Sequence, residues 1–202
     1  MTDAGLVCSS VPMLYAGRRP DHVAGPNGAL LATFLLNPSG SRCNDQDLSG
    51  GWRALEEKPG CTEAAADLLK DWREAHRAEL KIGDLHINYW HEGQLRAGLD
   101  GQTQRAVRLL MAGVNPQVAG DGFQDYALGT VAFLNGDRAG LEAARARLAA
   151  TPEPENWAEV TASFREKYNV QIKWPMNLDV LDGLIACFGK SYDEAYGDCR
   201  PA

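Results

Sequence analysis

The stretch from His86 to Glu92 contains residue types that could carry acid–base or metal chemistry. A helical zinc site of the HExxH type needs two histidines four residues apart, so that both imidazole rings project from one face of the helix. His86 and His91 are five residues apart, which separates them by about 140° around a helix. They cannot chelate a metal as that motif does, and we expect no metal and no cofactor. A small enzyme that uses His91 and Glu92 stays open as an alternative.

Charge and motifs narrow the class of partner. The sequence has no GxSxG, GxxxxGK[ST] or GxGxxG motif, so hydrolase and nucleotide-binding chemistry lack support. Its net charge is -7, and none of its 20 basic residues lies in a dense run, which disfavours binding to nucleic acid. No apolar run approaches the roughly 18 residues of a membrane span. We therefore expect no nucleic acid and no membrane partner, but another protein or a peptide, and the net charge favours a basic or neutral one.

The five cysteines contain no CxxC pair, which disfavours a zinc knuckle or a thioredoxin-type site. Two separations, Cys43 to Cys61 and Cys187 to Cys199, would each close a short loop as a disulfide. The alternative is reduced cysteines packed as small apolar side chains. As written, the N-terminus lacks the features of a signal peptide, so we expect a cytoplasmic protein, or a periplasmic or secreted one if a signal peptide has been removed.

Composition divides the chain at about residue 50. Proline and glycine recur so often in residues 1–50 that we predict an irregular N-terminal arm in which only residues 29–36 can hold a short helix. From residue 51 to 202 apolar residues recur every three or four positions, as at Ala65, Leu68, Leu69 and Trp72, which predicts a helical domain. The predicted helices are residues 62–79, 84–99, 103–113, 123–134, 138–150, 156–168 and 178–188, with a short one after residue 191. Residues 170–174 are either a short strand or a loop.

Turn and capping residues indicate where these helices begin and how they are joined. Asp100-Gly101 and Asn135-Gly136-Asp137 each join two of them into an antiparallel hairpin, and Asp137 can cap the helix that follows it. Two further pairs have the spacing of helix N-terminal caps, Asn156 with Glu159 and Ser191 with Glu194.

The two hairpins repeat one pattern of residues. The first contains Trp90, Ala97, Gly101, Ala106, Leu110 and Pro116, and the second contains Leu128, Gly129, Ala132, Gly136, Leu148 and Pro152. In these positions the chain resembles a divergent tetratricopeptide-repeat (TPR) protein, a family built from 34-residue helical hairpins. A weaker third unit can be matched to Gly60, Ala65 and Leu69. Two residues depart from the family pattern: Arg145 replaces a large apolar residue, and Gly113 replaces an alanine.

The resemblance implies an all-α fold in which antiparallel helical hairpins stack as a short TPR-like α-solenoid after an irregular N-terminal arm. It also implies that the first helix of each hairpin lines a concave groove for a partner. Matched residue by residue, this binding groove contains Asn88, His91, Leu95, Tyr126, Thr130 and Phe133. Polar tips beside aromatic rings suit peptide recognition, although such residues also serve as core. A helical bundle without repeat geometry is the alternative fold.

The leading hypothesis is therefore a non-enzymatic protein- or peptide-binding module that uses a TPR-like groove. A second hypothesis is an acidic immunity or antitoxin-type protein that masks a basic toxin. It rests on the size and charge of the chain and on an acidic patch that could form from Asp179, Asp182, Asp193, Glu194 and Asp198.

Overall fold

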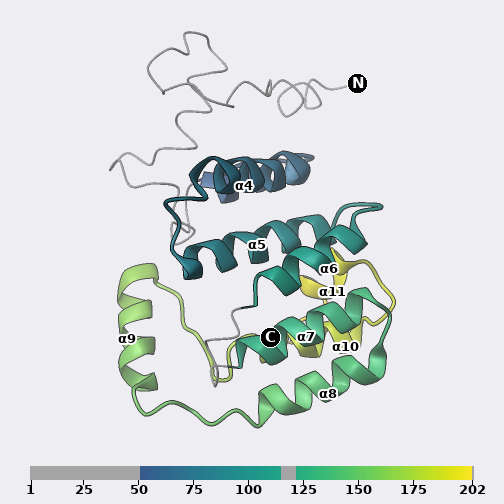
Figure 1. Ribbon diagram of the computed structural model, residues 1–202. Helices are drawn as coiled ribbons and strands as arrows, with labels where there is room; N and C mark the ends of the chain where they lie inside the picture. The colour runs from purple at the N-terminus through teal and green to yellow at the C-terminus, as the bar shows by residue number, and fades with distance from the viewer. Residues whose placement is uncertain (1–50, 115–121, 202) are drawn as a thin grey trace.

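The computed structural model describes residues 51–114 and 122–201. Within these two ranges every regular element is a helix and no strand occurs (Figure 1). The predicted all-α class is thereby confirmed for the described part of the chain. The expected N-terminal arm, residues 1–50, lies outside the described residues. No helix in the described ranges has the length and apolar character that a membrane crossing requires.

The helices follow the predicted boundaries closely. In chain order they are α3 (Gly51–Glu56), α4 (Thr62–His76), α5 (Ile82–Ala97), α6 (Thr103–Ala112), α7 (Phe123–Leu134), α8 (Arg138–Ala149), α9 (Trp157–Tyr168), α10 (Leu178–Ala186) and α11 (Tyr192–Tyr196). Helix α3 was not predicted. Residues 170–174, which could have been a strand, form a loop.

Two of the three predicted helix caps are present. The side chain of Asp137 accepts a hydrogen bond from the backbone N–H of Gly140 at 2.9 Å, and Ser191 Oγ accepts one from Glu194 at 3.3 Å. The predicted cap at Asn156 is wrong, because its side chain makes no capping hydrogen bond. A capping residue normally has an extended backbone, whereas Asn156 has φ -91° and ψ 13°.

Consecutive helices from α3 to α8 pack against one another in chain order, and they form successive layers in Figure 1. Helix α10 packs against both α7 and α8, and α11 packs against α10. The turns that join α5 to α6, α7 to α8 and α10 to α11 all lie on the right-hand side of Figure 1. Helix α9 stands on the opposite side, runs across the direction of the other helices, and belongs to none of the closely packed pairs.

Helices α5 and α6 approach closely because glycine occupies two contact positions. A Cβ atom at Gly93 would lie 2.9 Å from the backbone nitrogen of Leu110, and one at Gly113 would lie 2.9 Å from the Cα atom of Trp90. The alanine that the repeat pattern has at position 113 would therefore collide with the main chain of α5. This contact explains the departure from the family pattern at Gly113.

The main core lies among α5, α6, α7, α8, α10 and α11. Trp90 is at its centre, with ring centroids 4.8 Å from Phe123 and 5.1 Å from Tyr126. Leucines from three helices complete it, namely Leu110, Leu141, Leu148, Leu181 and Leu184, all of which are fully buried. A smaller apolar cluster joins α4 to α5 and consists of Ala65, Ala66, Leu69 and Leu95.

The second departure from the repeat pattern also has a structural explanation. Arg145 on α8 is bound by Asp182 on α10, with nitrogen–oxygen distances of 2.7 and 3.2 Å. Hydrogen bonding to Asp182 raises the pKa of Arg145, against the opposing effect of its partial burial. An ion pair between helices therefore occupies the place of a large apolar residue.

Candidate functional site

The six residues of the predicted groove do not form one open surface. Asn88, Leu95, Tyr126, Thr130 and Phe133 are buried, and only His91 is partly exposed. Leu95 belongs to the small cluster between α4 and α5, whereas Tyr126 and Phe133 belong to the main core. Leu95, Tyr126 and Phe133 thus pack between helices, and Asn88 and Thr130 are buried beside them.

Two of these residues, Asn88 and Thr130, donate hydrogen bonds within their own helices. Asn88 Nδ2 donates to the carbonyl oxygen of Asp84 at 2.7 Å, and Thr130 Oγ1 donates to the carbonyl oxygen of Tyr126 at 3.0 Å. Tyr126 Oη accepts a hydrogen bond from Gln94 at 3.2 Å, which links α7 to α5. These residues lie on the inner faces of α5 and α7, and those faces are packed against other helices.

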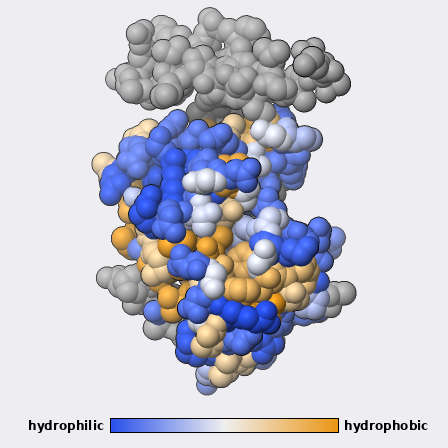
Figure 2. All heavy atoms as spheres, turned by 90° about the vertical axis from the view of Figure 1, so that its right-hand side faces the viewer, coloured by the Kyte–Doolittle hydropathy of each residue, from blue (hydrophilic) through white to orange (hydrophobic). Residues whose placement is uncertain are grey.

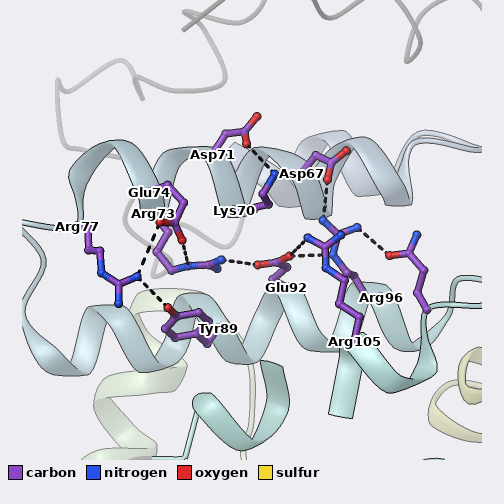
Figure 3. Close-up of polar contacts among 11 residues, drawn as sticks. Asp67, Lys70, Asp71, Arg73, Glu74, Arg77, Tyr89, Glu92, Arg96 and Arg105 are labelled. Atoms are coloured by element: carbon purple, nitrogen blue, oxygen red, sulfur yellow. Dashed lines mark hydrogen bonds and ion pairs between the residues drawn. The ribbon is translucent and has the colours of Figure 1, made fainter. Parts of the chain in front are cut away.

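Glu92 lies at the centre of a buried charge cluster between α4, α5 and α6 (Figure 3). Its Oε1 atom accepts from Arg96 Nε and from Arg105 Nη2, each at 2.8 Å. Its Oε2 atom lies 2.7 Å from Arg73 Nη2. One fully buried carboxylate thus receives three guanidinium groups, which we call the Glu92 cluster.

The cluster extends outward to the surface through Arg96. Arg96 Nη2 donates to Asp67 at 2.6 Å and Nη1 donates to Gln102 at 2.9 Å. Burial opposes the positive charge of Arg96, but hydrogen bonds to Asp67 and Glu92 outweigh that effect and raise its pKa. Arg96 therefore remains charged, and the carboxylates around it compensate that charge.

Arg73 is the least satisfied member of the cluster. Its guanidinium carbon lies 4.1 Å from the ring centre of Tyr89, a cation–π arrangement. Its buried Nε and Nη1 atoms make no hydrogen bond within the described residues, although Nε lies 3.5 Å from Glu74 Oε1. Burying these charges carries a considerable desolvation cost, so the cluster contributes less net stability than its short distances suggest. Its geometry determines how α4 packs on α5.

The geometry does not bring His91 and Glu92 into a common site. The carboxylate of Glu92 faces the three arginines, whereas the ring of His91 lies against Trp52 with centroids 5.0 Å apart. His86 Nδ1 lies 2.8 Å from the carbonyl oxygen of Ala112. Among the described residues there is no group of three or more His, Cys, Asp or Glu side chains placed to hold a metal ion.

The acidic residues near the C-terminus are largely paired with cations of the same chain. Asp179 pairs with Arg200, Asp182 with Arg145, and Glu194 with Lys190. Asp193 lies directly over Gly98, where any larger side chain would meet its carboxylate. The acidic patch that would mask a basic partner is therefore partly neutralised from within.

One disulfide ties down the C-terminal segment. Cys187, just after α10, is joined to Cys199, one of the two pairings that the sequence allowed. Cys61 is also disulfide-bonded, while its expected partner, Cys43, lies outside the described residues. Disulfides are typical of proteins that work in an oxidising compartment.

A pocket of about 290 Å³ opens where three helix turns meet. One wall is the α5–α6 turn, the second is the α7–α8 turn, and the third is the segment that joins α10 to α11. Gly101, Gly136 and Gly189 stand at these turns with φ values of 73°, 70° and 91°, a backbone region that favours glycine. No atom lies within 4 Å of the place where their Cβ atoms would be, so the turns leave the pocket mouth open. We call this the turn pocket.

The lining of the turn pocket is about equally apolar and polar. Phe133, Leu134 and Phe188 supply apolar walls, while Asp100 and Lys190 contribute opposite charges, and both of these side chains are exposed. Figure 2 faces this side of the molecule and shows apolar residues gathered across its middle, with hydrophilic residues above and below. Such a pocket can hold one large apolar side chain and hydrogen-bond the backbone that carries it.

Comparison with known proteins finds no relative of this chain. No family model, no curated protein and no solved structure matches this chain.

Sequence reasoning missed both the Glu92 cluster and the turn pocket. Glu92 and Arg96 are four residues apart, a spacing that indicates an ion pair on a helix, but Arg73 and Arg105 reach them only through tertiary packing. The sequence identified the glycines at positions 101 and 136 as turn residues. Their meeting with Gly189 at one pocket depends on the placement of α10, which no local pattern reveals.

Proposed function

We propose that this chain is a non-enzymatic module that binds another protein or a peptide, built as a short TPR-like stack of helical hairpins. The observation that carries the proposal is the turn pocket, a cavity with a mixed apolar and polar lining at the shared end of three helix turns. The proposed binding position thereby moves from the packed inner faces of α5 and α7 to the ends of the hairpins. Phe133 is common to both, because it is a groove residue of the repeat pattern that also lines the pocket.

The chemistry of the pocket favours a peptide with one large apolar or aromatic anchor residue. Phe133 and Phe188 meet at a ring-centroid distance of 5.9 Å in an edge-to-face arrangement, which leaves a rigid apolar surface for such an anchor. Asp100 and Lys190 at the mouth offer a hydrogen-bond acceptor and a donor to the peptide main chain. Binding energy is commonly concentrated in a few anchor residues of this kind.

The test is a selection of random peptides on the full-length protein, followed by affinity measurement of the enriched peptides. Asp100→Trp places a bulky side chain at the mouth, and we expect it to weaken binding at least about tenfold, which is roughly 1.4 kcal/mol. The matched control is Gln104→Trp, an exposed position on α6 that does not line the pocket. Enriched peptides that bind both variants equally, or a selection that enriches none, would overturn the proposal.

The main alternative is an acidic immunity or antitoxin-type protein. Salt dependence of binding distinguishes it from a module that binds through the turn pocket. Binding through an apolar anchor should change little between about 50 and 500 mM salt. A complex that weakens steeply over this range would instead favour recognition of a basic partner by the acidic surface.

A further inference from the structure

The third wall of the turn pocket lies within a loop that a disulfide closes. This wall, residues 188–192, contains the turn between α10 and α11 on the right-hand side of Figure 1. Cys187 comes directly before the wall, and Cys199 follows α11, 12 residues further along the chain. Every residue that lines the pocket from this part of the chain therefore lies between the two cross-linked cysteines.

Local structure alone holds this wall weakly. Helix α11 has only five residues, and so short a helix is not stable on its own in water. The turn before it contains a backbone hydrogen bond from the N–H of Lys190 to the carbonyl oxygen of Cys187 at 3.0 Å. The ion pair of Lys190 with Glu194 is exposed and contributes little. The position of the wall therefore depends on how the two ends of the loop are held.

The two ends of the loop are held to different degrees. On the α11 side, Tyr192 and Ala195 are buried in the main core. On the α10 side, Phe188 is only partly buried. Phe188 is the residue that meets Phe133 in the pocket, and it directly follows Cys187 in the chain. The disulfide therefore restrains the less firmly packed part of the wall.

The disulfide between Cys187 and Cys199 is open to attack by a thiol reductant. Both cysteines are partly exposed, whereas Cys61, which is also disulfide-bonded, is only 2% exposed. Thiol–disulfide exchange requires an attacking thiolate to reach a sulfur atom, so its rate depends on access. We expect the C-terminal disulfide to be reduced before the one at Cys61.

We infer that the disulfide between Cys187 and Cys199 is a redox switch of the turn pocket: the oxidised chain binds its peptide, and reduction lowers the affinity. The inference rests on the proposed function, because it concerns the same pocket. Without the cross-link, Phe188 is held less firmly against Phe133, and the wall has to be ordered again when a peptide binds. Ordering a loop on binding costs affinity.

The reductant of this switch is a dithiol. One of its thiolates attacks a sulfur atom of the disulfide, which forms a mixed disulfide and releases the other cysteine as a thiolate that takes up a proton. The second thiol of the reductant then displaces the remaining cysteine. In total the dithiol loses two electrons and two protons and becomes a cyclic disulfide, while Cys187 and Cys199 gain them as two thiols. A disulfide oxidant reverses the exchange.

The test measures the affinity of the full-length protein for peptides selected on its oxidised form. Dithiothreitol reduces the protein, and alkylation followed by mass spectrometry confirms that Cys187 and Cys199 are thiols while Cys61 is still bonded. We expect reduction to weaken binding at least about tenfold, because the wall then has to be ordered by the peptide. Reoxidation should restore the original affinity.

A matched variant separates the effect of this bond from other effects of the reductant. The double variant Cys187→Ser, Cys199→Ser cannot form the cross-link, so it should bind like the reduced parent chain and should not respond to dithiothreitol. A response that persists in this variant would assign the effect to another disulfide and overturn the inference. Circular dichroism at the temperature of the binding measurement should show the same helix content in all forms.

Cleavage by trypsin reports on the wall without any peptide. Lys190 is exposed and lies within the wall, whereas Lys173 is exposed in the loop after α9. Cleavage of a folded protein requires local opening of the chain around the bond. Reduction should therefore speed cleavage after Lys190 at least about fivefold and leave cleavage after Lys173 unchanged.

Each result decides a separate statement. Equal affinity of the oxidised and reduced forms, or tighter binding by the reduced form, overturns the inference. Equal rates of cleavage after Lys190 in the two forms overturn the role of the disulfide in holding the wall. If no peptide binds the oxidised chain, the proposed function fails, and the cleavage rates alone then decide whether the disulfide holds the wall.

Discussion

The helices at the two ends of the stack pack through different kinds of interaction. At the α4–α5–α6 end, a buried carboxylate and three arginines accompany a small apolar cluster of two alanines and two leucines. At the α7–α8–α10 end, fully buried leucines and interlocking aromatic rings fill the space, and a disulfide closes the last turn. The same antiparallel arrangement of helices thus has a polar joint at one end and an apolar joint at the other.

The difference shows that a repeated helical pattern does not imply repeated energetics. An apolar joint tolerates small changes in angle because hydrophobic burial has no preferred direction. A buried ion cluster requires its hydrogen-bonding geometry and is costly to break once one partner is missing. We therefore expect the polar joint to determine the position of α4, and the apolar joint to supply most of the stability.

Removing the central charge should have the largest effect. Glu92→Gln keeps the size of the side chain but leaves Arg73, Arg96 and Arg105 without their shared carboxylate. We expect a loss of about 3 to 5 kcal/mol in the free energy of unfolding, measured by urea denaturation. The control is Glu142→Gln, which removes an exposed ion pair with Arg138 and should cost no more than about 0.5 kcal/mol. A small effect of Glu92→Gln would mean that the polar joint is not a distinct structural unit.

Truncating one leucine side chain should destabilise the apolar joint. Leu181 is fully buried on α10 and lies where a Cβ atom on Gly129 of α7 would approach its Cδ2 atom to 2.7 Å. Leu181→Ala should cost about 3 kcal/mol through lost burial and a cavity. Gly129→Ala alone should also destabilise, by about 1 to 3 kcal/mol of overpacking. Together the two changes should cost less than their sum, and strict additivity would contradict this contact.

The disulfide should contribute to the apolar joint but not to the polar one. Replacing both Cys187 and Cys199 by serine removes a cross-link between positions 12 residues apart. In the chain-entropy model, such a short loop is worth roughly 2 to 3 kcal/mol. Amide hydrogen exchange should accelerate first in α10 and α11, with α4 and α5 little affected. Equal acceleration in all helices would show that the two ends do not unfold separately.

Alkaline pH should lower the stability of the apolar joint. Burial raises the pKa of Tyr126 well above its ordinary value, and its neighbours Tyr196 and Tyr192 raise it further. Burial likewise raises the pKa of Tyr192. The unfolded chain loses these protons near pH 10 while the folded chain keeps them, so stability is complete below about pH 10 and falls above it.

Tyr126→Phe measures this contribution. Above pH 10 the variant should lose stability less steeply than the parent chain, by up to about 1.4 kcal/mol per pH unit. Urea denaturation at pH 8, 10 and 11 gives the two slopes. Parallel slopes would show that Tyr126 does not hold its proton in the folded state.

Local sequence patterns predicted most of the helices. The three-and-four spacing of apolar residues around Leu69 and Trp72, and the turns at Gly101 and Gly136, locate helices because they reflect interactions within a few residues. Ser191 and Asp137 were identified as caps for the same reason. The cap at Asn156 failed because its backbone conformation depends on how the chain enters α9, which the spacing of Asn and Glu does not specify.

The groove could be predicted as a helix face but not as a surface. Asn88, Leu95 and Thr130 do lie on the inner sides of their helices, yet whether an inner side is open or closed depends on the neighbouring helix. In this chain α4 covers one inner side, while α10 and α11 cover the other. Exposure is therefore a property of the assembled tertiary structure.

By itself, the sequence determined the helical class, nearly all helix boundaries and the two hairpin turns, because these follow from periodicity, capping and glycine geometry over short distances. Only the tertiary structure decided that Glu92 would gather three arginines, that three separate turns would enclose one pocket, and that α9 would stand apart. Each of these depends on contacts between residues far apart in the chain. These contacts form only when particular helices pack against one another, and no local sequence pattern specifies which helices do so.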